Sequence, residues 1–306
     1  MMYDIIVIGG GPAGLTAAVY ALRGGRSVLV IEKNSFGGQI AYSPKVENIP
    51  GTLQISGAAF ADQLVEQAMN LGADMELECV NLIERKENRF IVHTEEDSVF
   101  EGSAVILALG VKHRMLELEG EEDLIGRGLS FCAVCDGAFY AGQEVAMIGG
   151  GNSALQEALL LSEVCSKVTV VQNLSDFTGE KKLAETLLEK ENVEIQFNTV
   201  VRRYLQNNGD VTGLELYNTQ TDTVSQITVT GVFLAVGLVP ENDAFASLAQ
   251  LNQWGYFDSG ENCCTGTPGL FVAGDCRSKR IRQVVTAAAD GAVAATAACE
   301  YLDQIL

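Results

Sequence analysis

The sequence predicts an α/β protein made of two doubly wound βαβ units, with the second unit inserted into the first. Three observations predict this fold. A pattern of strand, glycine turn, helix and strand occurs twice, and strand-like segments that end in glycine follow each copy. The length of 306 residues also favours about two domains.

The repeat pairs residues 3–15 with residues 143–155, at a constant offset of 140. The offset continues into the next strand of each copy, Val28–Ile31 and Val168–Val171. Short β-branched runs of this kind are typical of parallel strands that are buried on both faces. The repeat therefore indicates two copies of one supersecondary unit.

The first copy carries the run Gly9-x-Gly11-x-x-Gly14 between its strand and its helix. In a Rossmann-like dinucleotide site the first glycine makes a tight turn, the second lets a pyrophosphate approach, and the third lets helix and strand pack closely. The positive end of the helix dipole then favours phosphate. A glycine-rich turn in an unrelated α/β protein has the same spacing, but Glu32 stands where a ribose-binding acid is expected.

The second copy repeats the turn with Gly149, Gly151 and, in the third place, Ala154, which the pattern permits. Two dinucleotide sites on one chain indicate that one nucleotide passes electrons to the other. We expect this second site to include the following residues: Gly149, Gly151, Asn152, Ser153 and Ala154.

Later segments complete the first unit. Residues 105–110, 232–237 and 269–275 each read as a buried strand that ends in glycine, and residues 284–302 read as an alanine-rich helix. We therefore expect the chain to cross between the units near residues 113–116 and 240–246. The predicted domains are residues 1–114 with 245–306, and residues 115–244.

Composition excludes several functions. A net charge of −20 repels nucleic-acid backbones and anionic lipid surfaces. The first residues lack the positive flank of a signal peptide, and no apolar stretch approaches the roughly 20 residues of a membrane span. We therefore expect a cytoplasmic protein that binds neither nucleic acid nor membrane.

The run Cys132-Ala133-Val134-Cys135-Asp136 is the strongest candidate for chemistry. In a reducing compartment a C-x-x-C pair indicates redox chemistry, half of a zinc site, or unreactive core thiols. Zinc needs more ligands, and the chain offers only two histidines and an adjacent pair, Cys263–Cys264, with the wrong spacing. The redox reading is favoured. The other cysteines read as small apolar residues: Cys79, Cys165, Cys263, Cys264, Cys276 and Cys299.

With these residues in place, the chain resembles the low-molecular-weight bacterial thioredoxin reductases over nearly its whole length. The resemblance rests on both glycine fingerprints, the C-x-x-C-D run and several shorter matches. These are 37–39, 47–51, 126–128, 274–275 and 282–283.

The resemblance implies FAD in the first unit, a nicotinamide nucleotide beside the dithiol in the second, and a homodimer. Domain rotation in this family presents the flavin to each in turn. The residues expected at FAD are Gly9, Gly11, Pro12, Ala13, Gly14, Glu32, Lys33, Gly38, Gln39, Asn48, Gly110, Asp275, Arg282, Gln283 and Val284.

By the same resemblance, Cys135 faces the flavin and Cys132 attacks the disulfide of thioredoxin or a thioredoxin-like protein. Asp136 is the expected general acid for a leaving thiolate. The C-x-x-C spacing keeps the second thiol close enough to resolve a mixed disulfide.

The chain departs from the family at the 2′-phosphate of NADPH. Typical members carry a His-Arg-Arg run and a further arginine there, whereas this chain has Gln172-Asn173-Leu174 and Thr178. Each missing charge-assisted hydrogen bond is worth about 1.5–3 kcal/mol. Three donors stay open: NADH, NADPH held through Lys181 or Lys182, and a ferredoxin.

Three functions are compared. The first is a thioredoxin reductase-like enzyme, which the dithiol and the resemblance favour. The second is an oxidase that forms disulfides in a small dithiol with oxygen as acceptor, which the missing arginines motivate. The third is a flavin-bearing sensor or binding module, which no extra interaction domain in the sequence supports.

Overall fold

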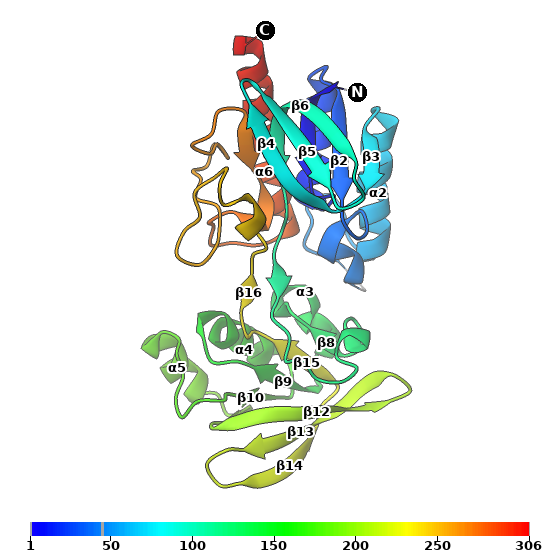
Figure 1. The fold of residues 1–306 in the computed structure, drawn as a ribbon. Coiled ribbons are helices and arrows are strands. Elements are labelled where there is room, and N and C mark those ends of the chain that lie inside the picture. The colour runs from blue at the N-terminus through cyan, green and yellow to red at the C-terminus, as the bar shows by residue number, and fades with distance from the viewer. Residues whose placement is uncertain (1, 44–45, 306) are drawn as a thin grey trace. The chain divides into compact units, whose positions relative to one another are not determined.

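The computed structural model describes residues 2–43 and 46–305. They divide into two compact units, of which the second is formed almost entirely by residues 113–238 (Figure 1). The chain passes between the units at β7 (Lys112–His113) and β16 (Leu238–Val239), and these two short strands pair with each other.

The first unit is built on a seven-stranded sheet. Its parallel strands follow the order β3-β2-β1-β6, and β17 pairs in parallel with the second half of β6. The first half of β6 pairs instead with antiparallel β5, which in turn pairs with antiparallel β4. The bounds are β1 (Met2–Ile8), β2 (Val28–Glu32), β3 (Asp74–Leu77), β4 (Val80–Lys86), β5 (Arg89–Thr94), β6 (Val99–Leu107) and β17 (Leu270–Val272).

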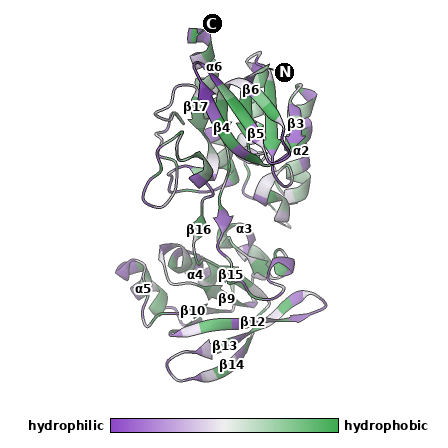
Figure 2. Cartoon of the chain, viewed as in Figure 1, coloured by the Kyte–Doolittle hydropathy of each residue, from purple (hydrophilic) through white to green (hydrophobic). Residues whose placement is uncertain are grey.

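Both faces of this parallel sheet are covered, as the unbroken hydrophobic runs predict. Alternate residues of β1 enter different apolar clusters: Ile5 and Val7 lie in one, and Ile6 and Ile8 in the other. In Figure 2, β6 accordingly shows as a largely green, hydrophobic strand, whereas β3 at the edge of the sheet is partly purple. The helices of this unit are α1 (Pro12–Arg23), α2 (Gly57–Asn70) and α6 (Val284–Ile305), with the short helices η1 (Gly38–Tyr42), η4 (Asp243–Phe245) and η5 (Gly274–Cys276).

Helices α1 and α6 pack together through small residues. A Cβ atom on Gly291 would lie 2.1 Å from the carbonyl oxygen of Ala13, so only glycine permits this approach. Ala17 and Ala294 are fully buried in the same cluster. The C-terminal helix therefore supports the helix that follows the first glycine turn.

The second unit holds a five-stranded parallel sheet in the order β11-β10-β9-β15-β8 and a separate antiparallel sheet in the order β12-β13-β14. Its helices are α3 (Ala133–Asp136), α4 (Asn152–Val164) and α5 (Lys181–Leu188), with η2 (Glu122–Leu124) and η3 (Gly137–Tyr140). The strands are β8 (Leu129–Ser130), β9 (Glu144–Ile148), β10 (Lys167–Val171), β11 (Val193–Gln196), β12 (Thr199–Asn207), β13 (Asp210–Asn218), β14 (Thr223–Thr228) and β15 (Gly231–Leu234).

The repeat in the sequence is a repeat in the structure. The succession β1–α1–β2 of the first unit corresponds to β9–α4–β10 of the second, and in each unit the two strands are parallel neighbours. The predicted fold class, with two Rossmann-like βαβ units, is confirmed. Across the described residues, no helix is long and apolar enough to cross a membrane.

Candidate functional site: a dithiol and two glycine turns

The first glycine turn leaves room for a ligand to approach its backbone. Gly9 has φ of +107°, and a Cβ atom there would lie 2.3 Å from the Ala108 carbonyl oxygen. A Cβ atom on Gly14 would lie 1.8 Å from the Gly9 carbonyl oxygen, so this position holds helix and turn together. A Cβ atom on Gly11, by contrast, would lie no closer than 3.8 Å to any residue other than its neighbours in the chain, the nearest atom being the Cα of Gly38. Space is thus kept at the glycine that is expected to meet a pyrophosphate.

Glu32 lies directly beside this turn. Its Oε2 accepts a 2.7 Å hydrogen bond from the Gly10 N–H, and its Oε1 accepts one from the Asn34 N–H. Each carboxylate oxygen has a second lone pair, so the group has capacity left for a ribose hydroxyl. Lys33, by contrast, pairs with Glu241.

The other expected FAD residues come from several segments. Gly38 begins η1, and a Cβ atom there would lie 3.0 Å from the Gly11 Cα, so this segment borders the turn. Gln39 donates its side-chain amide to the Val111 carbonyl. Gly110 has φ of +67°, with no atom within 4 Å of its would-be Cβ position. Asn48 groups with the second unit.

Asp275 lies in η5, where the chain turns after β17. Its Oδ1 is buried and accepts no hydrogen bond from the residues that the structure describes, and the Lys279 ammonium forms an ion pair with it at 3.7 Å. Burial raises the pKa of Asp275, and Lys279 and Arg282 oppose that rise. Arg282 donates to the Asp275 carbonyl and stacks over the Tyr256 ring.

A buried oxygen without a donor fits a ligand hydroxyl, because a buried carboxylate is costly unless it is hydrogen-bonded. Gln283 and Val284 lead into α6 just beyond. Three features fit a dinucleotide that carries hydroxyl groups, such as FAD. These are the open space at Gly11, the free lone pairs of the Glu32 carboxylate, and the buried Asp275 oxygen without a hydrogen-bond donor.

The expected dithiol is a disulfide between Cys132 and Cys135, with the two Cα atoms 5.3 Å apart. Cys132 precedes the short helix α3, and its sulfur accepts a 3.2 Å hydrogen bond from the Cys135 N–H. Both residues are partly exposed, and Val134 between them is 59% exposed. A hydrogen bond to sulfur favours its thiolate form, which is the reactive form in disulfide exchange.

Asp136 is adjacent to the disulfide and is held by Ser130. The Ser130 hydroxyl donates a 2.6 Å hydrogen bond to Asp136 Oδ2 and accepts one from the Cys132 N–H. Burial and the charge of Asp136 raise the pKa of Tyr140 to about 12. The sequence did not identify Ser130, because a serine at the end of a strand carries no distinguishing signal.

A second residue that sequence reasoning missed lies beneath the dithiol. Glu157 of α4 accepts a 3.1 Å hydrogen bond from the Ala133 N–H, inside the C-x-x-C run. Burial raises the pKa of Glu157 to about 7, against the lowering effect of that hydrogen bond.

The second glycine turn repeats the first. Gly149 has φ of +133°, and a Cβ atom there would lie 2.5 Å from the Ala235 carbonyl oxygen. Gly151 keeps its nearest atom, Thr178 Oγ1, 3.9 Å from the would-be Cβ position, and Asn152 and Ser153 begin α4. Ala154 is fully buried. This turn therefore also leaves room for a phosphate.

The segment after β10 is folded onto this turn without any cation. Gln172 is 4% exposed; its amide donates to the Asp176 carbonyl and accepts from the Asn173 N–H. The Thr178 N–H donates to the Gly150 carbonyl. The nearest charged side chain with a bond to the turn is an acid, Glu180, which accepts from the Asn152 amide.

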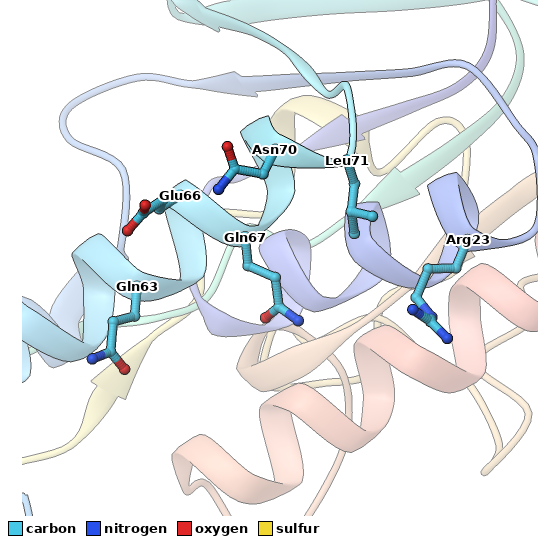
Figure 3. A pocket seen from close by; sticks show the side chains of 6 residues that line it. All are labelled: Arg23, Gln63, Glu66, Gln67, Asn70 and Leu71. Atoms are coloured by element: carbon cyan, nitrogen blue, oxygen red, sulfur yellow. The ribbon is translucent and has the colours of Figure 1, made fainter.

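Other features lie apart from this chemistry. A surface depression of about 400 Å³ between α1 and α2 is lined by Arg23, Gln63, Glu66, Gln67, Asn70 and Leu71, none of which is an expected site residue (Figure 3). Within the described part of the chain, no group of histidine, cysteine or acidic side chains could hold a metal ion. The six other cysteines are free thiols.

Comparison with known proteins gives the family. The model of the pyridine nucleotide-disulphide oxidoreductases matches residues 3–291. The chain is 36% identical to the thioredoxin reductase of Bacillus subtilis over 99% of this chain and 96% of that protein. It is 38% identical to the thioredoxin reductase of Listeria innocua over 99% and 95%.

The structure agrees with these sequences. The crystal structure of thioredoxin reductase from Streptococcus pyogenes superposes with a TM-score of 0.93 at 36% identity, covering 99% of each chain. The chain belongs to the pyridine nucleotide-disulphide oxidoreductase family, within its low-molecular-weight thioredoxin reductase branch.

Proposed function

We propose that the chain is a FAD-dependent enzyme that uses Cys132 and Cys135 to reduce the disulfide of thioredoxin or a thioredoxin-like protein. The observation that carries this function is the Cys132–Cys135 disulfide with Asp136 beside it. FAD belongs to the first unit, where the turn at Gly11 and the orphaned oxygen of Asp275 fit it. The second unit holds the nicotinamide nucleotide.

When bound, FAD supplies the two electrons that open the Cys132–Cys135 disulfide. The Cys132 thiolate then attacks the substrate disulfide, and a mixed disulfide forms while the first substrate sulfur leaves as a thiolate. Asp136 gives that thiolate its proton, and Ser130 holds the acid in place for the transfer. Cys135 attacks the sulfur of Cys132 and releases the second substrate sulfur.

The test is electron transfer to a protein disulfide. The enzyme is reduced photochemically under nitrogen and mixed with oxidised thioredoxin, and the free thiols of thioredoxin are counted. We expect four thioredoxin thiols for each fully reduced subunit, two from the dithiol and two from the reduced flavin, and none from the Cys132→Ser or Cys135→Ser variant. Failure to transfer electrons to any thioredoxin-fold protein overturns the proposal.

The nicotinamide donor is NADH rather than NADPH. Gln172 has already used its amide within the loop, and Lys181 pairs with Glu185 one turn further along α5. The 2′-phosphate of NADPH would find no cation at residues 172–174 or at Thr178, where the family has basic residues, and Glu180 two residues further on is an acid. Like charges repel. Anaerobic mixing with each nucleotide in turn, followed at the visible flavin band, decides between the two.

A ferredoxin donor has little support from the one basic cluster that the sequence offers. Arg277 and Lys279 are 8% and 9% exposed in their side chains and both pair with Asp290. They are therefore committed inside the first unit. Arg282 bonds the Asp275 carbonyl and stacks over Tyr256, so of this cluster Arg280 is left to receive an acidic partner. If neither nucleotide bleaches the flavin, a protein donor becomes the preferred explanation. Rapid peroxide formation with a small dithiol would favour the oxidase.

The enzyme is expected to act in the cytoplasm as a homodimer. Six free cysteines suit a reducing compartment. Sedimentation of the flavin-bound protein tests the dimer, and cell fractionation tests the location.

A further inference from the structure

The carboxylate of Glu157 lies beside the dithiol, on a helix whose other buried residues are apolar except for Ser162. It occupies the position in α4 that corresponds to Ala17 in α1, where the first unit has a fully buried alanine. Its neighbours Leu155, Ala158 and Leu161 are fully buried. A carboxylate at such a position costs free energy of folding unless it is hydrogen-bonded, which indicates a functional role for Glu157.

The contact of this carboxylate points to that reason. Its Oε2 accepts the N–H of Ala133, the residue that follows Cys132. Four covalent bonds join that nitrogen to the Cys132 sulfur, so the carboxylate oxygen lies within about 8 Å of the sulfur. α3 packs directly on α4 in the second unit (Figure 1). Negative charges on both groups would therefore repel each other.

Several charged groups around α4 form ion pairs with one another or with neighbouring elements. Lys167 pairs with Glu194, Lys181 with Glu185, and Glu163 with Lys190. The titratable residues of α4 and of the elements packed on it are Cys135, Asp136, Tyr140, Glu144, Glu163, Lys167, Lys181, Lys182 and Glu185. Burial and the Ala133 N–H are the two causes that shift the pKa of Glu157, so no cation holds this carboxyl in its ionised form.

We propose that Glu157 is a positioning residue of the dithiol that shares one proton with the Cys132 thiol. In the reduced enzyme the proton lies either on the Cys132 sulfur, with Glu157 ionised, or on the Glu157 carboxyl, with Cys132 a thiolate. The exchange moves one proton from sulfur to oxygen and releases none. The site can thus present a thiolate without holding two adjacent negative charges.

Sharing of a proton has a measurable form. Two groups that interact by more than about one pKa unit titrate in two steps that belong to the pair. Charges about 8 Å apart in a partly buried site interact by roughly one to two pKa units. The thiolate of Cys132 should accordingly form in two steps as the pH rises, the first of them near the titration of Glu157.

The experiment measures how fast iodoacetamide alkylates Cys132 between pH 5 and 10. The flavin-bound enzyme is reduced chemically, freed of reductant under nitrogen, and the modified cysteine is identified by mass spectrometry. We expect a two-step profile for the wild type. Glu157→Gln should give a single step, with its midpoint about one pH unit lower because the repelling charge is gone.

The control is Glu163→Gln, which removes an exposed acid from the same helix and should reproduce the wild-type profile. A one-step wild-type profile that superimposes on that of Glu157→Gln overturns the proposal. If Glu157→Gln does not fold, the wild type is compared with Glu157→Asp instead. Two steps in both profiles support the proposal, and one step in the wild type overturns it. The inference rests on the proposed role of the dithiol, but this measurement needs neither thioredoxin nor a nicotinamide nucleotide. A failure of the proposed substrate or donor would therefore leave its result unchanged.

Discussion

The hydroxyl of Ser130 donates a 2.6 Å hydrogen bond to the carboxylate of Asp136, across the run that contains both redox cysteines. The same hydroxyl accepts the Cys132 N–H, so one buried serine bonds both to the proposed acid and to the backbone of Cys132. Orientation of the acid therefore depends on a residue outside the C-x-x-C-D run.

Ser130→Ala should lower kcat for thioredoxin reduction by about 10-fold, because a hydrogen bond to a charged group is worth about 1.5–3 kcal/mol. Asp136→Asn should lower it by about 10²-fold or more, the usual contribution of a general acid. The double variant should be no slower than Asp136→Asn alone. Ser162→Ala is the control, since that buried hydroxyl bonds only to the Leu159 carbonyl in α4. Equal rates for Ser130→Ala and the wild type would contradict the positioning role.

Gly11→Ala and Gly151→Ala form a matched pair at the two turns. The added methyl meets no protein atom within 3.8 Å in either case, so both variants should fold. Crowding against a bound pyrophosphate costs about 1–3 kcal/mol, or roughly 5- to 150-fold in affinity. We expect Gly11→Ala to weaken FAD binding, and Gly151→Ala to keep FAD but raise KM for the nicotinamide nucleotide. The flavin-to-protein ratio and the steady-state kinetics measure the two effects. The opposite result would mean that FAD binds at the second turn and the nicotinamide nucleotide at the first.

Arginines placed at Asn173 and Thr178 should turn the enzyme toward NADPH. Two charge-assisted hydrogen bonds to the 2′-phosphate, each worth about 1.5–3 kcal/mol, should lower KM for NADPH by about 10-fold or more. KM for NADH should change little. Thr223→Arg combined with Ser225→Arg adds two cations on exposed β14 and controls for the change in net charge. An unchanged preference in the double variant would mean that the nucleotide does not reach this loop.

Glu121 and Tyr204 make a buried pair in the second unit that should be costly to break. Glu121 is 3% exposed and accepts the Tyr204 hydroxyl together with backbone N–H groups of residues 116–118. Tyr204→Phe should lower the free energy of unfolding by about 1.5–3 kcal/mol. Tyr217→Phe, which loses an exposed bond to Asp222, should cost far less. Urea unfolding of both variants gives the comparison, and equal losses would contradict the buried role.

The stability of the protein should depend on pH through Glu157. Its pKa is raised from 4.5 to about 7 in the folded state, so the folded state binds this proton more tightly than the unfolded state. The stabilisation is complete below about pH 4.5 and is lost as the pH rises through 7. Relative to the wild type, Glu157→Gln should therefore gain about 1–3 kcal/mol between pH 5 and pH 8. Thermal unfolding at both pH values measures this gain, and Glu163→Gln should show none.

Much of the fold followed from the sequence because backbone requirements leave local marks. Gly9 and Gly149 must adopt positive φ, and the strands beside them are buried on both faces. Both glycine turns can therefore be recognised from one sequence alone. The C-x-x-C-D run is likewise local. The pairing of its two cysteines could therefore be predicted without knowing which distant residues lie nearby.

Ser130 and Glu157 could not be found in the same way, because their roles come from packing between segments. Glu157 reaches the dithiol only once α3 lies on α4. One signal was present: the internal alignment sets this acid opposite Ala17, a buried position. Arg277 and Lys279 show the converse: charged side chains are mostly exposed in proteins, but these two are buried against Asp290.

The close packing of Gly291 on Ala13 has a consequence for how the protein is made. Residues 113–238 are continuous and precede β17 and α6 in the chain, so they leave the ribosome before those two elements do. The second unit is therefore free to fold first, as domains generally fold as units during synthesis. The first unit must wait, with one face of α1 uncovered, until α6 arrives. Flavin capture is thus among the last events in the maturation of this chain.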